Sequence, residues 1–357
     1  MTETPAPVPA PEPSLEARAL PPGPSQDRLL LPTARATAPL AAFAVLAVSV
    51  AHGIAPALQG AVVGVSDVID AIDSVGATLT QLLFVWLIGV ALGLVSAWVQ
   101  SRGPFVLKLL AIALAVPLTL VVFASMALPR TPPIFHLVVG TLSGTASLVF
   151  GLDALLRRQL LGTVPLGVGL ASMLRGWSSF ASELTMDSHR DLVAMTTSYS
   201  WARVFSTVAH VVLALALLFA VAAAARWSPR RGLVVGLTTL ATFLGTWQVA
   251  RIPPAEIESL AALLLARLAQ CLSSLPPTLL PPGIDQSVSV LPVLVSTLTL
   301  AVAPRSDRPV AAAAALCIAT SVNAEVPVLA LCLLVGSMSL ALAARDPHEV
   351  GLAVERS

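Results

Sequence analysis

The sequence predicts an all-α protein: a polytopic transmembrane helical bundle of about ten spans that follows a disordered, proline-rich N-terminal tail. Two observations lead to this fold class. Over 357 residues the charged fraction is 11% and the mean hydropathy is +0.88, whereas about a quarter of the residues in a soluble domain are charged. Apolar segments also recur along most of the chain, and most of them approach the roughly 20 residues that a helix needs to cross a bilayer.

The first 36 residues differ in composition from the rest. Proline alternates with other residues from Pro5 to Pro13 and returns at 21–24, and proline at this density prevents a helix. We therefore expect residues 1–36 to form a disordered cytoplasmic tail, partly in polyproline II conformation. The transmembrane domain should cover 37–345, and a short cytoplasmic tail should follow at 346–357.

The individual spans are placed by apolar length. They are expected at about 39–63, 77–99, 104–128, 133–155, 160–175, 204–225, 232–250, 287–304, 309–322 and 326–344. Whether 160–175 and 309–322 cross the bilayer completely stays open, because both are short. The first of these contains Gly162 and Pro165, so a tilted span, a re-entrant loop and an interfacial helix all fit it.

The positions of the arginines orient the chain, because Lys and Arg near span ends are retained in the cytoplasm. With ten spans and a cytoplasmic N-terminus, most of the 20 basic residues fall inside. The basic residues expected on the outer side are Arg130, Arg175, Arg190, Arg203, Arg251 and Arg267. Both termini are therefore predicted to be cytoplasmic. The composition, rich in Ala, Leu and Val with Lys108 as its single lysine, suggests a bacterial protein of the inner membrane.

Two outer connections are long enough to have structure of their own. The first, 176–203, carries Trp177 near its start and Trp201 near its end, and tryptophan is enriched at membrane interfaces. It is expected to lie on the outer leaflet or to cap the bundle. The second, 252–286, contains a leucine-rich amphipathic stretch at 256–267 between proline pairs, which favours an interfacial position.

The candidate catalytic residues lie in the first outer connection. Glu183, Asp187 and Asp191 follow one another at intervals of four, so they share one helical face, with His189 and Arg190 beside them. Carboxylates and an imidazole can hold a divalent cation. However, His189 lies about 200° round a regular helix from Asp187. A solvated acidic face paired with Arg190 explains these residues without a ligand, so we expect no metal and no cofactor.

Two histidines are the candidate substrate-binding residues. His52 lies near the middle of the first span, where Gly53 and Pro56 can distort the helix. Broken helices at mid-membrane are where transporters often bind substrates or ions. His210 lies closer to an expected outer boundary. For His52, a neutral histidine that is hydrogen-bonded to a neighbouring helix is the more frequent alternative.

Further motifs bear on packing and on excluded partners. Gly140-x-x-x-Gly144 and Gly89-x-x-x-Gly93 allow close helix approach. Asp153 lies four residues before Arg157, so the two can neutralise each other. The chain lacks the P-loop and GxGxxG signatures, and its net charge is +1, so neither nucleotide nor nucleic acid is an expected partner. The expected partners are the lipid bilayer and, as an open alternative, another membrane protein.

The sequence therefore favours a non-catalytic component of a bacterial envelope complex, and it leans against an enzyme. Two alternatives stay open. One is a transporter or lipid-handling carrier with a mid-membrane site near His52. The other is an envelope enzyme that acts on a lipid-linked substrate at the outer surface through the acidic cluster.

Overall fold

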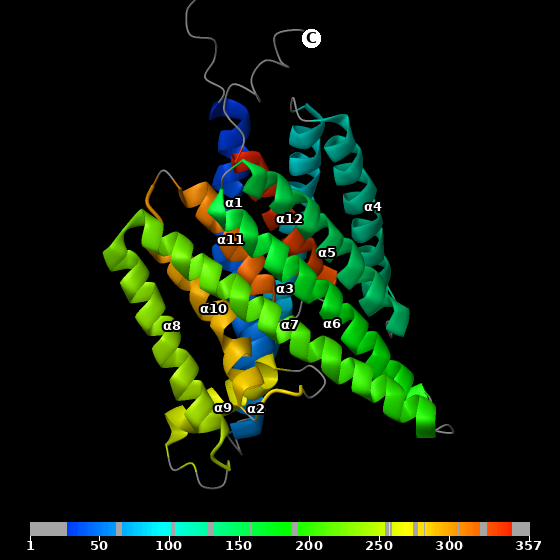
Figure 1. The fold of residues 1–357 in the computed structure, drawn as a ribbon, viewed down its shortest axis with the longest axis vertical. Coiled ribbons are helices and arrows are strands. Elements are labelled where there is room, and N and C mark those ends of the chain that lie inside the picture. The colour runs from blue at the N-terminus through cyan, green and yellow to red at the C-terminus, as the bar shows by residue number, and fades with distance from the viewer. Residues whose placement is uncertain are drawn as a thin grey trace, which may run out of the picture.

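The computed structural model is a bundle of helices, and the part of the chain that it describes contains no strand (Figure 1). It describes residues 27–61, 66–100, 104–127, 132–157, 159–187, 192–253, 257, 259–273, 278–281, 283–305, 307–321 and 327–344. The helices are α1 (Asp27–Val48), η2 (Ser49–Ile54, a π-helix), α2 (Ala55–Ala61), α3 (Ser66–Gln100), α4 (Phe105–Ala127), α5 (Pro133–Leu156), η3 (Leu160–Gly162, a 3-10 turn), α6 (Thr163–Asp187), α7 (Leu192–Trp227), α8 (Pro229–Ala250), α9 (Leu260–Leu272), α10 (Ile284–Val302), α11 (Arg308–Thr320) and α12 (Pro327–Ala343).

Among the residues that the structure describes, seven helices are long and apolar enough to cross a membrane. This confirms the predicted class of membrane helical bundle, while the predicted number of about ten spans is not confirmed. The seven helices are Thr37–Leu58, Val68–Val99, Phe105–Ala124, Ile134–Leu156, Val193–Trp227, Pro229–Ala250 and Ile284–Val302. Of the other expected spans, α6 is long but carries Arg175 and Glu183. Helices α11 and α12 have 13 and 17 residues, or about 20 and 26 Å against a hydrocarbon thickness of about 30 Å.

The short helices α11 and α12 occupy the centre of the bundle (Figure 1). Every residue of α11 from Ala311 to Thr320, and every residue of α12 from Val328 to Leu342, is buried. They pack on each other, and α1, α3, α5 and α10 are among the helices around them. Because protein surrounds them instead of lipid, their length need not match the bilayer, and their carbonyl ends can be satisfied by neighbouring side chains.

The chain runs back and forth between two ends of the bundle. At one end, the hydroxyls of Thr37 and Ser339 lie 3.3 Å apart and join the start of α1 to the end of α12. Trp98, near the end of α3, donates to the carbonyl of Met338 at 3.3 Å in the same region. At the other end, His136 in α5 lies 3.8 Å from Glu183 in α6. We call these the Thr37 end and the His136 end; Figure 1 shows the start of α1 and the end of α12 together.

The region 176–203 differs from its expected place on the outer leaflet. Helix α6 continues through it to Asp187, and α7 already begins at Leu192. The polar and aromatic residues there join the two helices to each other: Ser178 donates to the carbonyl of Ala202 at 2.8 Å, and the rings of Trp177 and Phe205 lie 6.2 Å apart. The residues that suggested an interfacial segment therefore form the contact of an α6–α7 pair.

Other expectations have mixed outcomes. Residues 27–36 have helical backbone in α1, where a disordered tail is expected, while 1–26 and 345–357 lie outside the described residues. The leucine-rich stretch of the second outer connection forms α9, which packs against α2, α8 and α10. The pairing of Asp153 with Arg157 is confirmed, at 3.5 Å.

The two glycine motifs have opposite surroundings. A Cβ on Gly140 would lie 2.8 Å from the carbonyl oxygen of Ser172 and 3.1 Å from the Cα of Gly176, so α5 and α6 touch backbone to backbone there. Around Gly89 and Gly93 of α3, a Cβ would meet nothing within 4 Å. The first motif packs the bundle, and the second faces outward.

Candidate functional site

Buried polar residues meet where α6, α7, α10 and the end of α11 come together. They are Arg175, Ser206, His210, Ser289 and Ser321, which we call the Arg175–His210 cluster. Each is at most 1% exposed. A fully buried arginine inside a membrane bundle is costly, and such residues are rare and usually functional. This cluster is therefore the candidate site.

Arg175, in the middle of α6, contacts the end of α11, a helix that stops inside the bundle. Its Nη1 donates to the carbonyl oxygen of Ser321, which follows the last turn of α11. The last carbonyls of a helix have no partner within it and carry partial negative charge. The guanidinium supplies both a hydrogen-bond donor and a positive charge to this carbonyl end. A side chain of α6 therefore stabilises the end of α11 inside the bundle, whereas a longer helix would have ended at the surface. The sequence placed Arg175 at the outer surface, and its burial corrects that prediction.

His210 connects α7 to α10. Its Nδ1 lies 2.8 Å from the carbonyl of Ser206, and its Nε2 lies 3.4 Å from the hydroxyl of Ser289. A carbonyl only accepts, so Nδ1 carries a proton and Nε2 of the neutral ring is an acceptor. The Ser289 hydroxyl also donates to the carbonyl of Asp285 at 2.9 Å. Its single proton therefore has two acceptors, Nε2 of His210 and the carbonyl oxygen of Asp285, and can bond to either of them in turn.

A line of hydroxyls leads away from the cluster toward the core. Ser172 lies one turn before Arg175 on α6, and its Oγ is 3.2 Å from that of Ser143 on α5. Ser147, the next turn of α5, lies 2.9 Å from Ser337 on α12. All four serines are buried. Together with the cluster they supply one guanidinium, one imidazole and several hydroxyls, groups that bind anions or pass protons inside membrane proteins.

The first candidate histidine lies in a distorted helix, as its sequence suggests. His52 belongs to η2, where the amide of Ala55 bonds to the carbonyl of Val50. Pro56 has no amide to donate to the preceding turn, which explains the wider loop. The helix is distorted without being unwound. Gly53 is buried, and a Cβ added to it would lie 2.7 Å from the side chain of Leu268 in α9. His52 is half-buried and does not belong to the Arg175–His210 cluster.

The second candidate histidine lies further from the start of its helix than the sequence predicts. The sequence predicts a span that begins at 204 and places His210 near its outer boundary. Since α7 begins at Leu192, His210 falls in the middle of the helix and enters the cluster. The candidate residue is therefore part of the buried cluster, in a helix that begins earlier than the sequence predicts.

The acidic candidates are only partly described. Glu183 faces His136 at 3.8 Å, and the expected pairing of Arg190 with Glu183 or Asp187 stays a prediction. Asp187 ends α6, while His189, Arg190 and Asp191 lie outside the described residues. No group of three or more His, Cys, Asp or Glu suited to a metal occurs within the described part of the chain. Whether this cluster acts on a substrate stays a prediction.

Comparison with known proteins gives no further assignment: no family model, no curated protein and no solved structure matches this chain. The site must therefore be judged from its own residues. Arg175 is the member that sequence reasoning missed. Its signal is a lone arginine among small residues, with Ser172 and Gly176 on either side, a composition typical of a closely packed helix and untypical of a surface loop.

Proposed function

We propose that this protein is a multi-pass carrier of a bacterial inner membrane, and that the Arg175–His210 cluster handles its substrate or coupling ion. One observation carries the proposal: Arg175 is fully buried and bonds to the carbonyl end of α11, a helix that stops inside the bundle. Helices interrupted at membrane depth, with charged groups at their ends, are the usual construction of carrier sites.

The chemistry of the cluster favours an anionic group. A guanidinium binds carboxylate or phosphate oxygens through a planar set of donors. An anion at Arg175 would compete with the Ser321 carbonyl for the same donors. Binding would then loosen the end of α11, and this gives a direct route from occupancy to movement of the central α11–α12 hairpin.

The proposal includes ten crossings with both termini in the cytoplasm. The chain alternates between the Thr37 end and the His136 end, and α6, α11 and α12 take part in this alternation although they fall outside the seven apolar candidates. The arginine-bearing turn of α7 and α8 lies at the Thr37 end, where Arg231 donates to the carbonyl of Val302 at 2.9 Å. The positive-inside rule then assigns that end to the cytoplasm.

A second candidate, a component of an envelope complex, has one observation in its favour. Gly89 and Gly93 lie one turn apart on the exposed face of α3, with open space around both. Two such glycines let another transmembrane helix approach closely. A protein partner would dock there without any change at the Arg175–His210 cluster.

Native mass spectrometry of the full chain, extracted gently from its own membrane, separates the two candidates. A carrier should retain a small anionic molecule, and Arg175→Gln should lose that molecule. Arg251→Gln is the control, because Arg251 is an exposed residue directly after α8, and this variant should keep the molecule. A stoichiometric protein partner that is lost in Gly93→Leu and kept in Arg175→Gln would contradict the carrier and support the complex.

A further inference from the structure

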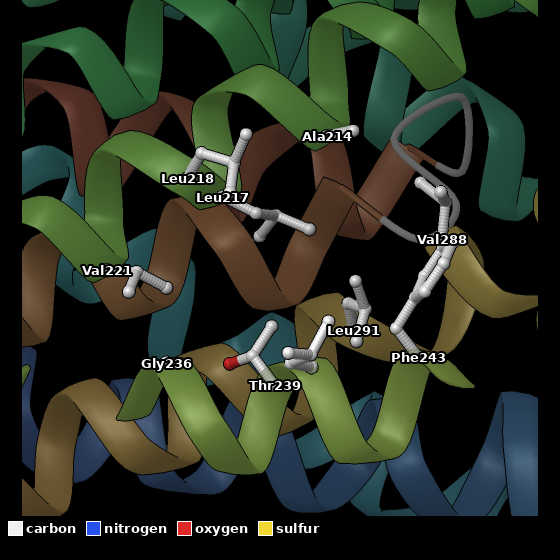
Figure 2. A pocket seen from close by; sticks show the side chains of 10 residues that line it. Ala214, Leu217, Leu218, Val221, Gly236, Thr239, Phe243, Val288 and Leu291 are labelled. Carbon is white, nitrogen blue, oxygen red and sulfur yellow. The ribbon is translucent and has the colours of Figure 1, made fainter. Parts of the chain in front are cut away.

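An apolar cleft opens between α7 and α8, with α10 as its floor (Figure 2). Its volume is about 260 Å³. Leu217, Leu218 and Val221 line it from α7, and Gly236 and Phe243 line it from α8. Leu218 is 62% exposed, so the cleft communicates with the surroundings of the bundle.

The cleft offers no polar group to a ligand. Thr239 is its one hydroxyl-bearing residue, and that hydroxyl donates to the carbonyl of Val235 at 2.6 Å within α8. Both walls belong to helices that are long and apolar enough to cross a membrane. In a bilayer, an apolar opening at this depth faces hydrocarbon, so a hydrocarbon chain is the occupant with matching chemistry.

Basic side chains lie at one end of the same cleft. Arg226 lies in the last turn of α7, and Arg230 and Arg231 lie in the first turn of α8; all three are exposed. Arg226 and Arg231 each lie five positions beyond a lining residue, Val221 and Gly236, which is about 7–8 Å along a helix. Arg226 also borders a separate hollow that contains Asp307. Even so, the turn carries a clear excess of positive charge beside the mouth of an apolar cleft.

We propose that this cleft seats an anionic phospholipid, with one acyl chain between α7 and α8 and the phosphate at the Arg226–Arg231 turn. Basic pockets between transmembrane helices bind anionic headgroups in this way. The site is separate from the Arg175–His210 cluster and does not depend on the carrier proposal. The bound lipid would hold α8 against the bundle. Only 17% of the residues in the apolar stretch of α8 are buried, the lowest share among the candidate spans.

The test places the full chain in nanodiscs of mixed phosphatidylglycerol and phosphatidylcholine and identifies the lipids that stay bound in native mass spectrometry. Wild type should retain phosphatidylglycerol in preference to phosphatidylcholine. Arg226→Gln with Arg230→Gln should weaken this preference about fivefold for each arginine. Arg251→Gln, which removes an exposed charge at the opposite end of α8, should leave it unchanged.

A second pair of variants tests the cleft itself. Gly236→Leu would fill it, since a Cβ there already lies 3.6 Å from Val221, whereas Gly245→Leu adds the same side chain where nothing lies within 4 Å. Only the first should displace the lipid. Equal retention of both lipids would overturn the headgroup assignment. No retained lipid, or a second copy of the chain or another protein lost on Gly236→Leu, would overturn the site as a whole.

Discussion

The guanidinium of Arg175 in α6 donates a hydrogen bond to the carbonyl oxygen of Ser321 at the end of α11, and both residues are buried. This contact joins a polar helix to the most buried part of the bundle. It supplies a partner for the carbonyl of Ser321, one of the groups that a helix end inside the protein leaves without an intrahelical bond. The α11–α12 hairpin therefore depends on a side chain from a helix that the apolar pattern alone would not place in the core.

Loss of the Arg175 side chain should destabilise the protein. A buried hydrogen bond to a charged group contributes about 1.5–3 kcal/mol, so Arg175→Ala should lower the thermal midpoint in detergent by about 5 °C. Arg251→Ala should change it by less than about 1 °C, because that residue is exposed. An unchanged midpoint in Arg175→Ala would show that the contact does not hold α11.

His210 and Ser289 should be energetically coupled. Their side chains lie 3.4 Å apart between α7 and α10, and hydrogen bonds between membrane helices average about 0.6 kcal/mol. A double-mutant cycle with His210→Ala and Ser289→Ala, read by unfolding in denaturing detergent, should give a coupling energy of about 0.5–1.5 kcal/mol. Strict additivity would mean that the contact contributes nothing.

Gly140 and Gly93 belong to the same type of motif, but replacing each of them by alanine should change the stability of the protein differently. At Gly140 the added Cβ would meet backbone atoms at 2.8 and 3.1 Å, so α5 and α6 must separate, whereas at Gly93 it meets nothing. Gly140→Ala should cost about 1–3 kcal/mol, and Gly93→Ala should leave the stability unchanged or slightly raised. Similar unfolding of the two variants would argue against the close α5–α6 packing.

Of the cysteines, only Cys271 should react with an impermeant maleimide added from the His136 end. Cys271 is half-buried in α9, while Cys317 and Cys332 are buried in the central helices. Burial raises the pKa of the Cys271 thiol, an effect that Arg267 partly opposes. Because the thiolate reacts, labelling should be slow at pH 7 and should accelerate as the pH rises toward 9. Labelling from the opposite side would reverse the proposed orientation.

Apolar length predicted the helices well because each hydrophobic segment had to be buried in protein or lipid. Ten expected spans have a corresponding helix, and the distortion around His52 was visible in Gly53 and Pro56. The predictions from sequence are wrong where they assume that a polar residue is exposed. Around Trp177 and Ser178, polar and aromatic groups bond to α7, and the partner helix of such a contact cannot be known from one sequence.

The same reason explains the missed site. Arg175 looked like a residue at the end of a short span, because its partner, the carbonyl of Ser321, is a backbone atom without a sequence signal. His210 is visible in the sequence as a polar residue, but its place in the middle of α7 depends on the helix beginning at Leu192. Only the packing of α6, α7, α10 and α11 brings these residues together.

The proposal that the Arg175–His210 cluster handles the substrate of a carrier requires the cluster to open to one side of the membrane during transport. The most direct measurement is labelling of Ser289→Cys by an impermeant maleimide in native membranes, with Cys271→Ser to remove the half-buried thiol. Ala146→Cys, buried to the same extent in α5, is the matched control. A carrier predicts that Ser289→Cys reacts while Ala146→Cys stays protected. Equal protection of both would contradict the carrier and leave a static bundle.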